Sequence, residues 1–292
     1  MNLLDLPWED ILCRHILAYL DFCDTFNMRR VSIAAKQLVS IHWALQRRLN
    51  FSKFASGFTV EAFQAVTANC ESVVELNLSD CAWLIDGCLI TFLKANPMLR
   101  DLNLTNCTNI SSSCVQAVAS HGSQITHLSL KNVPLAAYIL SDVFYRLHSL
   151  EKMDLSGCIF LDGTLLWEFG LKHNKVKWLG LADCRNITDE AVVWLLGNCK
   201  SLQYLDVSNC SIKRPLKLLR AVLENRRSLR LLIMTKTQLD VETEHHLKKE
   251  SPHLTVIFKP PGENSKALLR AEPAQENQQG MHRANIPVNF LF

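Results

Sequence analysis

Short apolar segments recur along the chain, and each one ends in a polar turn. Five of them alternate apolar and polar residues and then reach a cysteine: LNLSDC from Leu76, LNLTNC from Leu102, MDLSGC from Met153, LGLADC from Leu179 and LDVSNC from Leu205. LSLKNV from Leu128 and LIMTKT from Leu232 follow the same frame, while LNFSKF from Leu49 and IFKPPG from Ile257 extend it. Alternation over so few residues predicts one short strand in each segment.

The spacing of these segments predicts a repeat architecture. The first positions 76, 102, 128, 153, 179, 205 and 232 follow one another at intervals of 25 to 27 residues. This period, with apolar residues in the pattern L-x-x-L-x-L-x-x-N/C, is typical of leucine-rich repeats. Stacked repeats bury their leucines in one continuous core.

The segment between two strands has the pattern of a helix. In NITDEAVVWLLGNC, Thr188 is the expected N-cap, Asp189 and Glu190 fall in the first turn, and apolar residues follow at helical spacing. LIDGCLITFLKAN and NISSSCVQAVASH repeat this design after Cys81 and Cys107. We therefore predict an α/β fold: a leucine-rich-repeat solenoid shaped as a horseshoe, with parallel strands on the concave side and helices outside.

The repeated cysteine could be a metal ligand, a reactive thiol, half of a disulfide or a packing residue. It occupies one column of the repeat, at Cys81, Cys107, Cys158, Cys184 and Cys210. Val133 and Thr237 hold the same column in other repeats, and neither could be a ligand. Because cysteine behaves as a small hydrophobic residue with a weak S–H donor, we predict that the column is structural. No metal or cofactor is expected.

Composition favours an intracellular protein. The eleven cysteines are odd in number and form no Cys-x-x-Cys pair, the N-terminus lacks the pattern of a secretory signal, and the apolar runs are too short to span a membrane. We expect a cytoplasmic protein, with the nucleus as a second location. A net charge of +3 indicates no polyanionic partner. A basic stretch is predicted to form a solvated helix face rather than a nucleic-acid site: Lys213, Arg214, Lys217, Arg220, Arg226, Arg227 and Arg230.

The first forty residues do not follow the repeat. LLDLPWEDILCRHILAYL predicts a helix that starts after Pro7, and CDTFNMRRVSIAAKQLVSIHWAL predicts two more helical pieces. Such a short unit buries little surface alone, so it should pack on the first repeat or on a partner. We expect three parts: residues 1–42, a repeat domain over 43–258, and a linker with an apolar tail over 259–292.

The N-terminal residues carry a family resemblance. LPWEDIL, followed by IL, YL and VS, resembles the F-box, the helical module by which adaptor subunits bind the Skp1 protein. An F-box followed by cysteine-containing repeats resembles the F-box/LRR family of substrate receptors. The sequence departs from the F-box pattern in two places, because the interval from Leu6 to Ile16 looks two residues longer than usual and Ala35 stands where many members have a tryptophan.

The resemblance implies a function. The chain would be the substrate-recognition adaptor of a Skp1–cullin–F-box ubiquitin ligase, a non-catalytic subunit whose target is ubiquitinated by other subunits and degraded by the proteasome. Its nearest family members suggest a Smurf-type HECT ligase as target. The implied Skp1-facing residues are Leu6, Pro7, Ile11, Leu12, Ile16, Leu17, Leu20 and Val31. Ile16 and Leu17 could equally close the core of the small domain. The alternative function is a scaffold or inhibitor whose N-terminal helices cap the solenoid.

Strand alternation locates the concave face, because residues between the buried leucines point away from the core. The column before each first leucine contains Glu75, Asp101, His127, Lys152, Trp178, Tyr204 and Leu231, and the middle column contains Asn77, Asn103, Ser129, Asp154, Gly180, Asp206 and Ile233. His127 could meet an acid across repeats or be a plain surface histidine, which we favour. The expected substrate-binding residues are Lys152, Trp178, Tyr204, Asp206, Leu231 and Ile233. Alternatively, these side chains only cover a widened surface.

The C-terminal segment changes character after Ile257. KPPGENSKALLRAEPAQENQQGMHR has the composition of a segment that cannot form a core, whereas the closing ANIPVNFLF is apolar. We expect this apolar end to dock near Trp178, Tyr204, Leu231 and Ile233, where it would complete or gate the substrate site. The alternative is a disordered tail that another protein reads.

Overall fold

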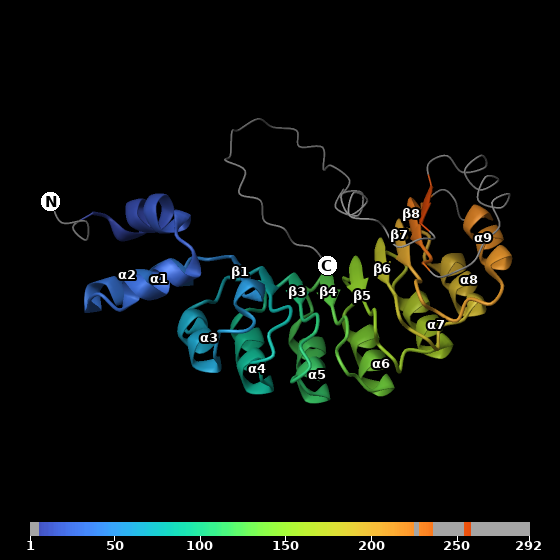
Figure 1. Cartoon of the computed structure of the whole chain (residues 1–292), viewed down its shortest axis with the longest axis horizontal. Coiled ribbons are helices and arrows are strands. Elements are labelled where there is room, and N and C mark those ends of the chain that lie inside the picture. The colour runs from blue at the N-terminus through green and yellow to red at the C-terminus, as the bar shows by residue number, and fades with distance from the viewer. Residues whose placement is uncertain (1–5, 225–227, 236–253, 258–292) are drawn as a thin grey trace.

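The computed structural model describes residues 6–224, 228–235 and 254–257. Its strands form one nine-stranded parallel sheet in sequence order (Figure 1). The strands are β1 Arg48–Asn50, β2 Glu75–Asn77, β3 Asp101–Asn103, β4 His127–Ser129, β5 Lys152–Asp154, β6 Trp178–Gly180, β7 Tyr204–Asp206, β8 Leu231–Ile233 and β9 Thr255–Ile257. Their register pairs equivalent residues of successive repeats, such as Leu76 with Leu102.

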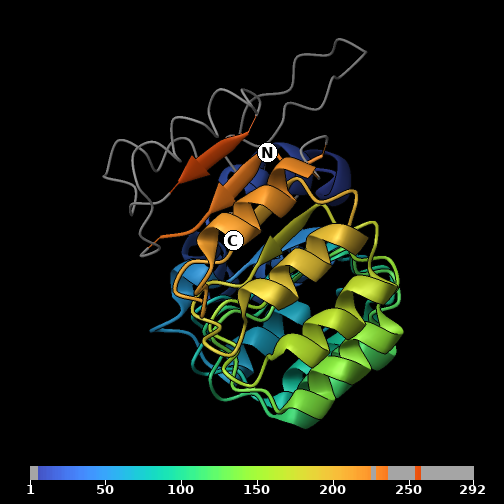
Figure 2. The same ribbon diagram turned by 90° about the vertical axis from the view of Figure 1, so that its right-hand side faces the viewer.

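Helices cover the outer side of this sheet. They are α3 Val60–Thr67, α4 Asp86–Ala95, α5 Ser112–His121, α6 Ala137–Arg146, α7 Gly163–Lys172, α8 Asp189–Asn198 and α9 Pro215–Glu224, with a short 3-10 turn at Ser52–Phe54. Figure 2 shows the molecule from its C-terminal end. The orange helix α9 and the yellow helix α8 lie next to each other on one side of the last strands. The predicted α/β solenoid is confirmed, and the strands fall at the positions that the leucine spacing predicted.

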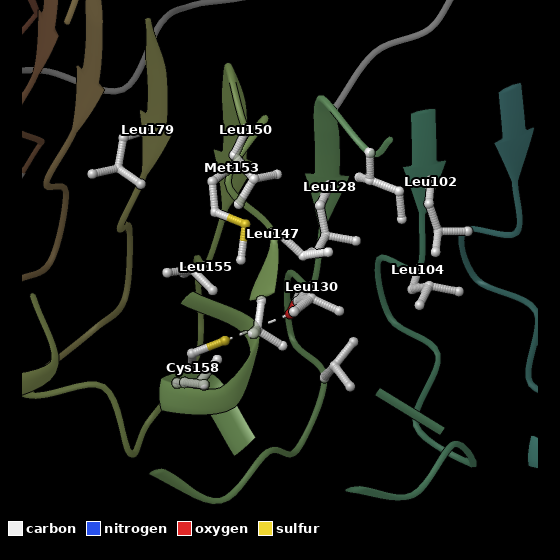
Figure 3. Packing of buried hydrophobic residues seen from close by; sticks show 14 of the residues in the cluster. Leu102, Leu104, Leu128, Leu130, Leu147, Leu150, Met153, Leu155, Cys158 and Leu179 are labelled. Carbon is white, nitrogen blue, oxygen red and sulfur yellow. Dashed lines mark hydrogen bonds between the residues drawn. The ribbon is translucent and has the colours of Figure 1, made fainter. Parts of the chain in front are cut away.

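The core is continuous from repeat to repeat. Leu102 and Leu104 pack beside Leu128 and Leu130 of the next repeat, and the series goes on through Met153 (Figure 3). Every one of these side chains is almost completely removed from solvent. Because no repeat could bury its leucines alone, stacking supplies the hydrophobic stabilisation.

The cysteine column is structural, as predicted. Cys81, Cys107, Cys158 and Cys184 are buried and unpaired, and each donates from Sγ to a carbonyl oxygen of the preceding repeat. Figure 3 shows the bond from Cys158 to Leu130 O, which is 3.6 Å long. Burial raises the pKa of the Cys184 thiol to about 12. A buried, protonated thiol is a poor nucleophile and a poor metal ligand.

Further cysteines serve other positions of the repeat. Cys199 forms the C-cap of α8, and Cys70 lies after the end of α3 and donates to Trp43 O at 3.2 Å. Cys88 and Cys114 lie on the buried faces of α4 and α5. The high cysteine content therefore reflects small buried positions that the repeat architecture provides many times.

A polar ladder runs along the turns that follow the strands. The residue before each column cysteine or its equivalent has a positive φ, at Asp80, Asn106, Asn132, Gly157, Asp183 and Asn209. Asn106 Nδ2 donates to Asp80 Oδ1 at 2.6 Å, and Asn132 Nδ2 donates to Asn106 Oδ1 at 2.7 Å. Asparagine, aspartate and glycine tolerate this left-handed conformation best, which explains the SDC, TNC and SGC endings.

The start of α8 follows the predicted capping. Thr188 Oγ1 accepts a hydrogen bond from Ala191 N at 3.4 Å, so Thr188 caps α8 as expected.

The basic stretch is exposed where it is described, at Lys213, Arg214, Lys217, Arg220 and Arg230. Arg214 pairs with Asp189 at 3.0 Å and also with Glu190. These contacts agree with a solvated face; Arg226 and Arg227 lie outside the described residues.

The N-terminal unit packs directly on the solenoid. It comprises a π-helix η2 Trp8–Ile16, a 3-10 turn η3 Leu17–Tyr19, α1 Phe22–Arg29 and α2 Ile33–Ala44. The Phe22 ring stacks on Phe51, just after β1, with centroids 5.4 Å apart, and Phe26 contacts Phe58 at 5.7 Å. The expectation that this unit covers the first repeat is confirmed. The domain boundary expected after residue 42 falls inside α2.

Candidate functional site: two surfaces of one solenoid

The N-terminal unit exposes several large apolar side chains. The exposed side chains, which we call the apolar set, are Pro7, Ile11, Tyr19, Leu20, Val31 and Ile33. Val31 and Ile33 are 78% and 79% exposed and flank the start of α2, and Tyr19 is 78% exposed at the end of η3. Apolar side chains that are this accessible on one small unit indicate a protein contact.

The structure corrects the expectation that one face carries all the implied Skp1-facing residues. Leu12 and Leu17 are each only 1% exposed and form a small core with Cys13 and Leu38. Leu6 and Ile16 are half-buried against the same cluster. A partner could not reach Leu12 or Leu17 without opening this core, so both stabilise the unit itself. Tyr19 and Ile33 were missed because sequence patterning does not show which side of a short turn is covered.

The π-helix accounts for the long interval from Leu6 to Ile16. Helix η2 follows Pro7, as predicted, and the amides of Ile11 and Leu12 both lie 3.1 Å from Pro7 O. A π-helix holds more residues per turn than an α-helix and is often found at functional sites. The wider turn takes up additional residues while Leu12 and Leu17 still reach the core.

The second surface is the concave side of the sheet. The column before each first leucine is half-buried along its length, from Glu75 to Leu231. The middle column is more covered than expected: Asn77, Asn103, Ser129 and Asp154 are all less than 5% exposed. Their side chains fold back onto the chain, and Asn77 Oδ1, for example, accepts from Ser79 N at 2.9 Å. Because neighbouring strands lie only about 4.8 Å apart, each such side chain is also flanked on both sides.

An ion pair and a histidine–carboxylate contact cover the N-terminal part of the concave side. Arg48 Nε lies 3.0 Å from Glu75 Oε1, and His127 Nδ1 lies 3.0 Å from Asp101 Oδ2 in the next pair of repeats. The favoured interpretation of His127 as a plain surface histidine is therefore wrong, and the cross-repeat contact with an acid is present. Burial raises the pKa of Glu75, and the Arg48 charge opposes this effect.

Aromatic and apolar residues cover the C-terminal part. The rings of Trp178 and Tyr204 are stacked, with centroids 4.5 Å apart and an interplanar angle of 10°. Leu231 continues the column and is half-buried, as is Lys152 at the other end, whereas Ile233 is 5% exposed and contributes little accessible surface. Burial raises the pKa of Tyr204, as do the charges of Asp206 and Asp154. The expected neighbourhood of Trp178 and Tyr204 is thus present; the expected docking of residues 282–292 lies outside the described residues.

Asp154 is a buried acid of this region that sequence reasoning did not single out. Asp154, Gly180 and Asp206 are register partners on β5, β6 and β7. A Cβ built on Gly180 would lie 2.5 Å from Asp154 Oδ1, so the carboxylate occupies the space beside the glycine. The signal in the sequence was the missing side chain at Gly180 between two acids of one column.

Within the described part of the chain, no helix is long and apolar enough to cross a membrane. The same residues contain no group of three histidine, cysteine or acidic side chains that could hold a metal ion.

Comparisons with known proteins agree with this architecture. Residues 3–45 match the F-box domain model, and residues 201–221 match the Leucine Rich Repeat model. The chain is 34% identical over 120 residues to F-box/LRR-repeat protein 15 of Rattus norvegicus and of Mus musculus, and the match covers 41% of this chain and 40% of each relative. F-box/LRR-repeat protein 4 of Bos taurus is 26% identical over 155 residues, covering 52% of this chain and 25% of that protein.

Among solved structures, an internalin from Listeria monocytogenes aligns with a TM-score of 0.47 and 18% identity over 66% of this chain and 56% of the internalin. The segments that match the F-box/LRR-repeat proteins cover less than half the length of those proteins. The chain combines an F-box domain with leucine-rich repeats and is similar to the F-box/LRR-repeat proteins.

Proposed function

We propose that this chain is the substrate-recognition adaptor of a Skp1–cullin–F-box ubiquitin ligase. The observation that carries the proposal is the apolar set on a unit that matches the F-box model. Its exposed members, Pro7, Ile11, Tyr19, Leu20, Val31 and Ile33, would contact Skp1, while half-buried Leu6 and Ile16 would support that surface from below. The chain itself would perform no chemistry, and ubiquitin would be transferred by the other subunits.

The concave face would select the protein to be ubiquitinated and degraded. Lys152, Trp178, Tyr204, Asp206 and Leu231 remain the proposed substrate contacts, and Ile233 would act mainly by supporting its neighbours. Stacked aromatic side chains are common at the energetic centre of protein interfaces. A Smurf-type HECT ligase as target, and a cytoplasmic or nuclear location, are parts of the proposal that rest on family resemblance alone.

Skp1 binding can be tested with variants that do not disturb the core. We would purify the chain with Skp1 and compare the wild type with Val31→Asp/Ile33→Asp, whose side chains are among the most exposed. Burying two charges in an apolar interface should weaken binding by at least about a hundredfold, because each uncompensated charge costs several kcal/mol. Leu171→Asp is the matched control, since Leu171 is 68% exposed on α7, outside the F-box. Equal binding by the double variant and the wild type would contradict the proposal.

A second candidate function is a scaffold or inhibitor in which the N-terminal helices serve only as a cap. The contacts of Phe22 with Phe51 and of Phe26 with Phe58 favour a capping contribution. A cap alone does not require exposed Val31 and Ile33. A stable, monodisperse chain with no measurable Skp1 affinity would favour this second function.

A further inference from the structure

The concave surface over β5 to β7 combines aromatic rings with carboxylates. Trp178 and Tyr204 form the stacked pair, and Asp154 and Asp206 lie in the neighbouring column at the register positions on either side of Gly180. Asp154 Oδ1 lies within 2.5 Å of the position where a Gly180 Cβ would be, so its carboxylate leans toward the central strand. One small area therefore presents a π surface together with half-buried Asp206, and the Asp154 carboxylate, which is only 4% exposed, lies two strands away in the same column.

The negative charge of this area is poorly balanced. The ion pairs within the described residues do not include Asp154 or Asp206. Burial raises the pKa of the Asp206 carboxyl, the hydrogen bonds from Ser208 lower it, the Asp154 charge raises it further, and the Lys131 charge opposes that rise. A carboxylate that is disfavoured by burial and by a second carboxylate is stabilised when a cation approaches.

We propose that this area, which we call the aromatic-acid surface, binds an arginine side chain of the substrate polypeptide. The inference rests on the proposed function, because it assigns a chemical class to the target of the concave face. A planar guanidinium can lie against an aromatic ring and still direct its N–H groups to carboxylate oxygens. Lysine carries a compact charge without that planar surface. It can therefore pair with the carboxylate but cannot also lie flat against the aromatic rings. Leu231, next in the column after Tyr204, provides apolar contact for a neighbouring residue of the same segment.

Peptide titration on the full 292-residue chain tests the proposal. The probe is the dye-labelled peptide acetyl-Ala-Leu-Arg-Leu-Ala-amide, and its control replaces arginine by citrulline, which has the same shape without the charge. Fluorescence anisotropy should show binding of the arginine peptide at least about tenfold tighter than of the citrulline peptide, as expected for a charge-assisted contact. A lysine peptide should fall between the two.

Variants separate a local contact from a general electrostatic effect. Asp206→Asn retains an oxygen that can accept the hydrogen bond from Ser208 N, which is 2.9 Å long, so the turn is kept. It should remove most of the discrimination between arginine and citrulline. Asp101→Asn removes an acid elsewhere on the concave side, and this variant should still discriminate between the arginine and citrulline peptides. Tyr204→Leu should weaken the arginine peptide more than the citrulline peptide.

Equal affinity of the wild type for the arginine and citrulline peptides would overturn the proposal, as would equal losses in Asp206→Asn and Asp101→Asn. Absence of binding to both peptides, with the surface instead occupied by a second copy or by residues 258–292 in crosslinking experiments, would also overturn it. Because the titration contains no Skp1, its outcome is independent of the F-box experiment. Failure of Skp1 binding with intact arginine discrimination would contradict the ligase assignment and leave this surface established.

Discussion

Cys184 Sγ lies 3.2 Å from the carbonyl oxygen of Leu155, which belongs to the preceding repeat. The same bond recurs from Cys107 to Leu78 O at 3.0 Å and from Cys210 to Leu181 O at 3.0 Å. The side chain thus fills a small buried space and gives a second hydrogen bond to a carbonyl oxygen that already accepts one from its own turn, as Leu155 O does from Cys158 N at 3.0 Å. This double requirement explains why cysteine, rather than a larger apolar residue, recurs in the column.

Cys184→Ala should lower the free energy of unfolding by about 1 kcal/mol or somewhat more, because it removes a buried sulfur and its hydrogen bond. Urea denaturation measures the change. The thiol should resist Ellman's reagent in the native state, because burial raises the pKa of Cys184 to about 12, whereas exposed Cys23 should react readily. A loss of bound zinc or of partner affinity at unchanged stability would contradict the packing assignment.

The polar ladder predicts an asymmetric response to Gly→Ala substitutions. Gly157 has a φ of +75°, and a Cβ there would lie 2.0 Å from Asn132 Oδ1. Gly157→Ala should therefore destabilise the chain by about 2 kcal/mol or more.

Gly87 is the matched control for this substitution. It lies in the first turn of α4 with nothing within 4 Å of the new methyl position. Gly87→Ala should be neutral or stabilising by up to about 1 kcal/mol. Equal destabilisation by Gly157→Ala and Gly87→Ala in thermal unfolding would refute the ladder geometry.

His173 predicts a loss of stability in mild acid. It caps α7, its Nε2 lies 3.0 Å from Phe144 O, and burial lowers its pKa to about 4. The unfolded chain then binds a proton near its usual pKa of about 6.5 while the folded chain does not, so stability decreases as the pH falls from about 6.5 to about 4. The full contribution is up to about 3 kcal/mol.

Unfolding titrations at several pH values measure this slope. His173→Asn should flatten the slope, since asparagine already caps α4 at Asn96 without titrating. His148→Asn, which replaces an exposed histidine, should reduce the slope only slightly, because the His148 charge is a lesser cause of the lowered pKa of His173 than burial is. A wild-type stability that is constant over this pH range would exclude the buried neutral histidine.

The solenoid could be predicted because its determinants are local and repeated. The position of Thr188 as a cap and the proximity of Trp178 to Tyr204 follow from one repeat unit and its period. The burial of Asn77 and Asn103 could not be predicted, because alternation gives the face of a side chain but not how closely its neighbours enclose it.

The N-terminal unit was harder to predict for a different reason. Nothing in WEDILCRHI distinguishes a π-helix from an α-helix, yet this geometry decides that Leu12 points into the core while Ile11 is 38% exposed. Helical periodicity of 3.6 residues places both near one face. The exposed pair Val31 and Ile33 depends in turn on how α1 meets α2, which is a tertiary property.

The negative charge of Asp206 should strengthen binding of an arginine and lower the stability of the folded chain. Its raised pKa, which burial causes first, means that the folded chain binds more protons than the unfolded chain between the ordinary carboxyl pKa and the raised one. Stability therefore decreases as the pH rises through this interval and stays lower at neutral pH. Asp206→Asn should raise the urea midpoint at pH 7, and the difference from the wild type should shrink at pH 3, where the carboxyl is protonated in both states. A variant that is less stable at pH 7 would show instead that the charge is balanced within the fold.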